Sequence, residues 1–213
     1  MRYRTDHQSI LLLMLAITFA GGCASKTQGE KTVQSYMHTR QTLAGSRRQV
    51  AQTQASLANL RTTPPQALKD AFRRYKDAVS QLEKQGTDAK WRAQSMKEQS
   101  DAHIQAWQEE MKTIKDPTIK ASVESRRDAV RSNFSLIQMY AEDARKAYEP
   151  FLQGNKDVLQ ALSIDLTPAA VSSLSSAIDR IVADGKTLDD KLWSMEHALD
   201  NIANGLSPLG QMK

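Results

Sequence analysis

The sequence has a single cysteine, Cys23, among its 213 residues. One thiol forms neither an internal disulfide nor a thiolate metal site, so both are excluded for the monomer. Aromatic residues make up only 6% of the chain, which contains nine glycines and six prolines. This composition is typical of long helices and unlike that of sheets, where aromatic side chains are enriched. We therefore expect an all-α protein.

The sequence also lacks an apolar run long enough to cross a bilayer, which takes about 20 residues. Its most hydrophobic stretch, Ile10–Ala20, follows the basic residues Arg2 and Arg4 and precedes two glycines. A basic start, a short apolar run and a small-residue exit are typical of a secretory signal peptide. We therefore predict that residues 1–22 are a signal peptide.

The end of this stretch, Ala20-Gly21-Gly22-Cys23, resembles a bacterial lipobox. In such a site the cysteine thiol accepts diacylglycerol and fatty acyl chains such as palmitate, which together anchor a protein firmly. We therefore predict lipidation at Cys23. The resemblance to proteobacterial lipoproteins, with Ala24 at the next position, implies export to the outer membrane. Two alternatives remain: an ordinary signal peptide with an incidental cysteine, or an N-terminal helix retained in the membrane.

Removal of residues 1–22 would leave 191 residues, which suits one domain. We expect a lipidated tether at 23–29, a single helical domain at 30–206 and a disordered tail at 207–213. The chain is basic, with a net charge of +5. Because an exported protein rarely meets nucleic acid, we do not read this charge as nucleic-acid binding.

The charge is unevenly distributed. Residues 24–63 carry a net charge of +5, whereas residues 167–204 carry −3. Basic residues near the anchor would suit an anionic lipid surface or envelope polymer. The alternative is that they match the acidic last helix or are simply solvated. The residues that we single out for contact with an anionic surface are Lys31, Arg40, Arg47 and Arg48.

Apolar side chains recur at helical spacing through the chain. In the first helix, expected at about 30–61, two positions of a seven-residue repeat fall on one face. One position is apolar, and the other, three residues later, is mostly small and polar. The first set is Tyr36, Leu43, Val50 and Leu57; the second is Thr39, Ser46, Thr53 and Leu60. This pattern predicts a narrow seam packed closely against another helix.

Helix boundaries are expected where prolines, glycines and capping residues fall. Thr63 and Gln66 are placed to form a capping box around Pro64. Gly86–Asp88 should interrupt the next helix, and Pro150 should end or kink a later one. Asp116-Pro117 should start that later helix, since an acidic cap followed by proline is a typical N-terminus.

The last helix should start at Thr167-Pro168 and has the most regular pattern. Its apolar positions step by three and four, with Gly185 as the only gap: Val171, Leu174, Ile178, Ile181, Leu188, Leu192, Met195, Leu199, Ile202 and Leu206. Long helices joined by short connections pack as antiparallel neighbours. We therefore predict an elongated antiparallel bundle with coiled-coil-like helices.

No catalytic constellation is apparent. Three histidines, His38, His103 and His197, follow the expected cleavage site, and none stands in a metal-binding motif. His103 adjoins the apolar stripe at Ile104, so a packed side chain is favoured over a ligand. We expect no catalytic residue, no metal and no cofactor.

Several segments from Phe72 to Ile202 resemble the bacterial family called domain of unknown function 2959 (DUF2959). They are Phe72–Lys76 (FRRYK), Ala106–Met111 (AWQEEM), Met139–Glu142 (MYAE), Tyr148–Phe151 (YEPF) and Asp157–Leu159 (DVL). The resemblance implies a helical protein, often exported or lipidated. It transfers no functional residues.

Together these features predict a periplasm-facing lipoprotein of the bacterial cell envelope, held to the membrane by its N-terminal lipid. We expect it to act by binding or scaffolding an envelope protein, without catalysis. One alternative is a periplasmic enzyme or enzyme activator with a site between helices near His103 and Trp107. Another is a homo-oligomeric coiled coil in which chains share the last-helix seam.

Overall fold

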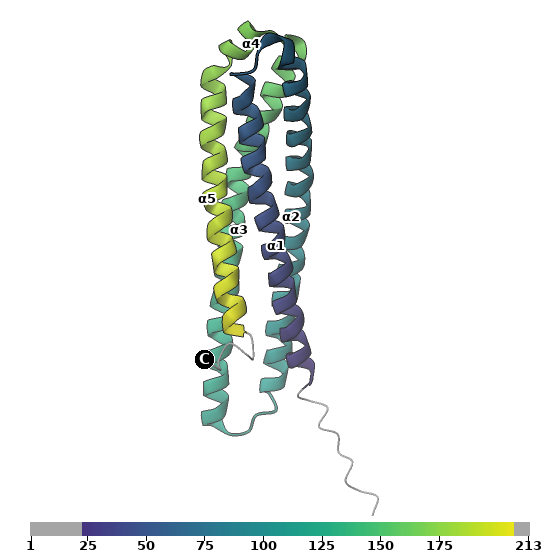
Figure 1. Cartoon of the computed structure of the whole chain (residues 1–213). Coiled ribbons are helices and arrows are strands. Elements are labelled where there is room, and N and C mark those ends of the chain that lie inside the picture. The colour runs from purple at the N-terminus through teal and green to yellow at the C-terminus, as the bar shows by residue number, and fades with distance from the viewer. Residues whose placement is uncertain (1–22, 207–213) are drawn as a thin grey trace, which may run out of the picture.

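The computed structural model describes residues 23–206, with side chains for 30–202 (Figure 1). These residues form four long helices, one short helix and a 3-10 turn. The elements are α1 (Cys23–Leu60), η1 (Pro65–Ala67), α2 (Leu68–Met111), α3 (Pro117–Ile164), α4 (Pro168–Ser173) and α5 (Ser175–Leu206). The predicted all-α bundle is confirmed.

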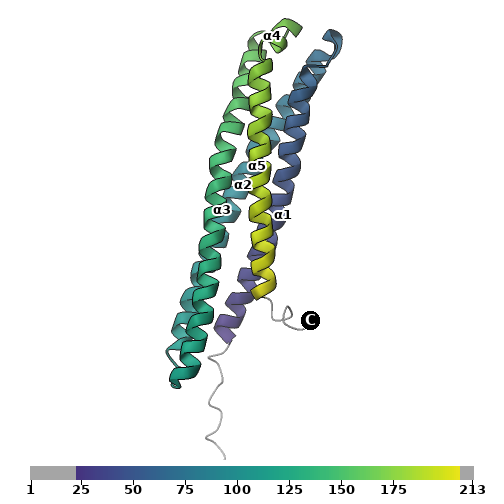
Figure 2. The same cartoon turned by 90° about the vertical axis from the view of Figure 1, so that its left-hand side faces the viewer.

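The long helices pack in a ring in chain order. Helix α1 contacts α2, α2 contacts α3, α3 contacts α5, and α5 closes the ring against α1. Each neighbour runs antiparallel to the next, as the short connections predict (Figure 1). Helix α3 has 48 residues and is therefore roughly 70 Å long. The hairpins α1–α2 and α3–α5 diverge at the end that carries η1 and α4 (Figure 2).

The two predicted seams form the core. All eight heptad positions of α1 are buried, including the small polar ones. Thr53 and Gln49 reach the carbonyl oxygen of Ala78 on α2, at 3.4 and 2.8 Å, so the close approach also satisfies polar atoms. The stripe on α5 is buried against α1 and α3 of the same chain. The α5 seam is therefore intramolecular.

The first helix starts earlier than predicted. Helix α1 begins at Cys23 instead of near Glu30, so residues 23–29, expected to be a tether, are helical. The capping box at Thr63 is also wrong. The Thr63 hydroxyl donates to the carbonyl oxygen of Asn59 at 2.6 Å and caps the end of α1 instead of the next helix.

The interruption predicted at Gly86–Asp88 is wrong, because α2 runs unbroken from Leu68 to Met111. A side chain at Gly86 would collide with the Tyr148 ring of α3. The glycine therefore serves close packing between two helices and not a turn. In that position the Tyr148 hydroxyl lies 3.4 Å from the carbonyl oxygen of Leu82.

Pro150, where an end or a kink is expected, does not end the helix, because α3 continues to Ile164. Pro150 is exposed, as is Lys146, whose carbonyl group lacks its usual donor four residues later. Water can hydrate that carbonyl group, while the next residue, Phe151, is fully buried. Packing of Phe151 offsets the lost hydrogen bond and carries the helix through the proline.

Two predicted caps are confirmed. Asp116 accepts hydrogen bonds from the backbone N–H groups of Thr118 and Ile119 at 2.8 and 3.0 Å. Thr167 accepts one from Ala170 at 3.2 Å. The expected last helix is divided at Leu174 into α4 and α5, yet its apolar stripe continues through both.

Candidate functional site

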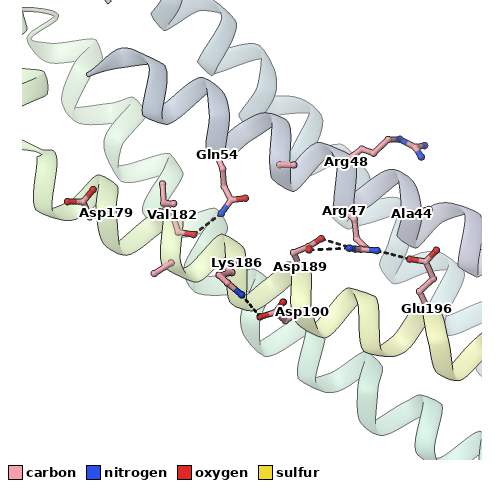
Figure 3. Close-up of a pocket in the computed structure, with 12 residues that line it drawn as sticks. Ala44, Arg47, Arg48, Gln54, Asp179, Val182, Lys186, Asp189, Asp190 and Glu196 are labelled. Carbon is pink, nitrogen blue, oxygen red and sulfur yellow. Dashed lines mark hydrogen bonds and ion pairs between the residues drawn. The ribbon is translucent and has the colours of Figure 1, made fainter. Parts of the chain in front are cut away.

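One surface hollow is a groove between α1 and α5, with a volume of about 890 Å³. Small side chains, including Ala44, Ala51 and Ala183, line it together with charged ones (Figure 3). Gln54 crosses between the helices and donates to the carbonyl oxygen of Val182 at 2.7 Å. The groove is thus an open trough whose lining is mostly apolar and carries charged groups of both signs.

The basic residue at the centre of this groove is Arg47. Its guanidinium forms a two-pronged pair with Asp189, at 2.8 and 3.2 Å, and reaches Glu196 at 3.2 Å (Figure 3). The hydrogen bonds to Asp189 raise the pKa of Arg47, which therefore remains charged. Because these groups are partly exposed, the pairs contribute at most about 1 kcal/mol each. These pairs join α5 to α1 at the surface, beside the buried seam.

Further ion pairs join the same two helices. Arg40 meets Asp200 at 2.6 Å, and Arg61 meets Asp179 at 2.5 Å, towards opposite ends of the interface. Charge matching between the basic first helix and the acidic last helix is therefore present for Arg40 and Arg47. Contact of these arginines with an anionic surface stays a prediction.

The other two residues selected for anionic contacts face solvent. Arg48 lies at the edge of the α1–α5 groove and points away from the acidic residues of α5 (Figure 3). Lys31 lines a smaller hollow between α1 and α2, of about 260 Å³, together with His38 and Arg92. The structure therefore separates the four basic residues into two that hold α5 and two that are exposed.

His103 is a core residue. Its ring lies 5.5 Å from that of Trp107 and 6.4 Å from that of Phe134, between centroids. Burial lowers the pKa of His103 and outweighs the opposing charge of Glu110, so the ring is neutral at pH 7. Neither of the two described hollows reaches His103. The packed His103 side chain that the sequence favours over a ligand is therefore present in the structure.

Two buried tyrosine pairs were not foreseen from the sequence. The Tyr36 hydroxyl lies 2.9 Å from Ser100 Oγ, and the Tyr75 hydroxyl donates to Asn155 at 2.9 Å. Burial raises the pKa of both tyrosines. Each pair joins helices whose contacting residues are far apart in sequence, so helical spacing alone gives no signal for it.

Within residues 23–206 no helix has the length of apolar sequence needed to cross a bilayer. The same residues contain no group of three or more His, Cys, Asp or Glu placed to hold a metal ion. Cys23 is the first residue of α1, and its side chain lies outside the described part of the chain. The signal peptide at 1–22 and the tail at 207–213 also fall outside it.

The fold and its grooves define the protein as a long, antiparallel four-helix bundle with a charged face. The chain belongs to the family described as a protein of unknown function, DUF2959, which it matches over residues 25–205. The match includes α1, whereas the segments that resemble the family in the sequence begin only at Phe72. No curated protein and no solved structure matches the chain.

Proposed function

We propose that this protein is a lipid-anchored component of the bacterial cell envelope that binds or scaffolds another envelope protein. The observation that carries the anchor is the lipobox-like sequence Ala20-Gly21-Gly22-Cys23, and Cys23 itself belongs to α1. An acyl chain there would attach to the helix itself. The bundle would then present its far end roughly 60 Å from the anchor, since α1 has 38 residues.

The groove between α1 and α5 is the face that we assign to a partner. It combines small apolar residues with charges of both signs, a composition suited to recognition with a polar rim. Arg47 is already occupied by α5, whereas Arg48 at the edge is available for a carboxylate. A partner segment with an acidic side chain fits this arrangement.

The anchor is tested by Cys23→Ala. Because the thiol is the acylation site, we expect the variant to leave the membrane fraction or to accumulate with its signal peptide uncleaved. Cell fractionation and immunoblotting measure both. Ser25→Ala is the matched control, which should be processed and sedimented like the wild type. A Cys23→Ala protein with unchanged size and membrane partitioning would contradict the anchor.

The partner face is tested by a photo-crosslinking amino acid at Ala51, an exposed groove residue. We expect a discrete adduct in cells, identifiable by mass spectrometry. The control position is Ala102, which is also exposed and helical but lies on α2, outside the groove. The adduct should weaken in Arg48→Glu. Equal adducts at both positions, or none at Ala51, would refute this face.

A further inference from the structure

The loop between α2 and α3 lies at the same end of the bundle as the start of α1 (Figures 1 and 2). Thr32 reaches the carbonyl oxygen of Gln99, and Thr53 that of Ala78. Because the two helices are antiparallel, each residue further along α1 lies beside a residue one position earlier in α2. Extended back to the start of α1, this register places Cys23 level with Gln108. Helix α2 continues for three more residues, roughly 5 Å, before the loop begins.

Helix α3 projects past Cys23 in the same way. Tyr75 contacts Asn155, and Tyr148 contacts the carbonyl oxygen of Leu82, which fixes the register of α3 on α2. Continued along the helices, this register puts Ile119 level with the last residue of α2. We call residues 112–120 the hairpin tip. The tip therefore extends beyond the level at which the anchor would leave the bundle.

The hairpin tip differs from the opposite end in its charge, whereas an exposed isoleucine is present at both ends, Ile164 being 82% exposed. Ile119 is 57% exposed, and Lys115 and Lys120 are exposed without an ion-pair partner among the described residues. The tip has three lysines and one aspartate, a net charge of +2, and one of these lysines, Lys112, is paired with Glu109 at 2.6 Å. At the other end, the connections 61–64 and 165–167 carry only Arg61, which is paired with Asp179, and Asp165.

We propose that the hairpin tip is a second membrane contact, resting on the anionic phospholipid headgroups of the bilayer that holds Cys23. The inference rests on the proposed acylation of Cys23. Helical structure from Cys23 onward leaves no slack segment that would lift the tip away from the surface. An exposed apolar side chain flanked by lysines suits the headgroup region, where apolar burial and attraction to anionic lipid act together.

The test uses full-length lipidated protein in vesicles of phosphatidylethanolamine and phosphatidylglycerol. Acylated Cys23 has no free thiol, so an introduced cysteine is the only labelling site. Ile119→Cys carries an environment-sensitive fluorophore at the tip. Ile164→Cys is the control, since Ile164 is 82% exposed at the end of α3 away from the anchor (Figure 1).

We expect a blue-shifted, several-fold brighter emission at position 119 than at 164, with quenching at 119 by spin-labelled lipid. The shift should diminish in Lys115→Glu/Lys120→Glu and in vesicles without phosphatidylglycerol. Vesicle flotation separates the two claims: protein that fails to float contradicts the anchor itself. If the protein floats but the fluorophore at position 119 emits like the one at position 164, the membrane contact is overturned. A blue shift at position 119 that appears only after envelope proteins are added would also overturn it.

Discussion

Leu192→Asp should lower the free energy of unfolding by at least about 4 kcal/mol. Leu192 is only 6% exposed and belongs to the apolar stripe of α5 that packs on α1 and α3. The substitution removes buried apolar surface and places a carboxylate where water is excluded. Because domains of this size are stable by about 5–15 kcal/mol, the loss should be visible as a large drop in the urea midpoint.

The matched control for Leu192→Asp is Thr187→Asp, which introduces the same charge on an exposed position of α5. Its effect should stay within about 0.5 kcal/mol. Circular dichroism at 222 nm during urea unfolding measures both variants. Equal midpoints for the two would show that the α5 seam is not a core, and would contradict the bundle.

Gly185→Leu should destabilise the protein by about 3 kcal/mol, although it fills the only gap in the stripe of α5. A Cβ atom at Gly185 would lie 2.6 Å from Gln54 Nε2 and 2.7 Å from Phe151 Cε2. The Phe151 ring is fully buried, and Gln54 is held by its bond to Val182. Neither neighbour can retreat without loss, so helices α1, α3 and α5 would have to separate.

Gly45 provides the comparison, because it is also a glycine within a long helix. A Cβ atom there would meet its nearest neighbours, Arg48 and Gln85, at 3.9 Å, an ordinary contact distance. Gly45→Ala should therefore stabilise by up to about 1 kcal/mol through helix propensity. Gly185→Ala should destabilise despite the same gain in propensity. Thermal unfolding of the pair measures the sign, and a stabilising Gly185→Ala would contradict the close crossing.

The seams of α1 and α5 could be predicted because a helix repeats its buried face at a fixed spacing, which the sequence displays directly. The small polar heptad positions of α1 even indicated a close neighbour, which is α2. Local rules failed where another helix decides the outcome. Gly86 reads as a turn or a kink without knowledge of Tyr148, and Pro150 reads as a helix end or a kink without knowledge of how Phe151 packs.

The candidate site was predictable in part. Opposite charge on the first and last helices indicated matching, and the pairs of Arg40 and Arg47 with α5 realise it. The rotation of each helix about its axis decides which basic residues form ion pairs and which stay exposed. Counts of charged residues in the sequence do not contain that rotation. The projection of Ile119 beyond Cys23 depends on the register between α1, α2 and α3, and no pattern within one helix contains it.

The central claim is that the thiol of Cys23 is acylated and holds the start of α1 at a bilayer. Intact-mass and N-terminal peptide mass spectrometry of the native, membrane-extracted protein tests it most directly. We predict a mature chain that begins at Cys23 and carries a diacylglyceryl group with a further fatty acid. A mature chain with an unmodified Cys23, or one that begins at another residue, would contradict the anchor and the membrane contact built on it.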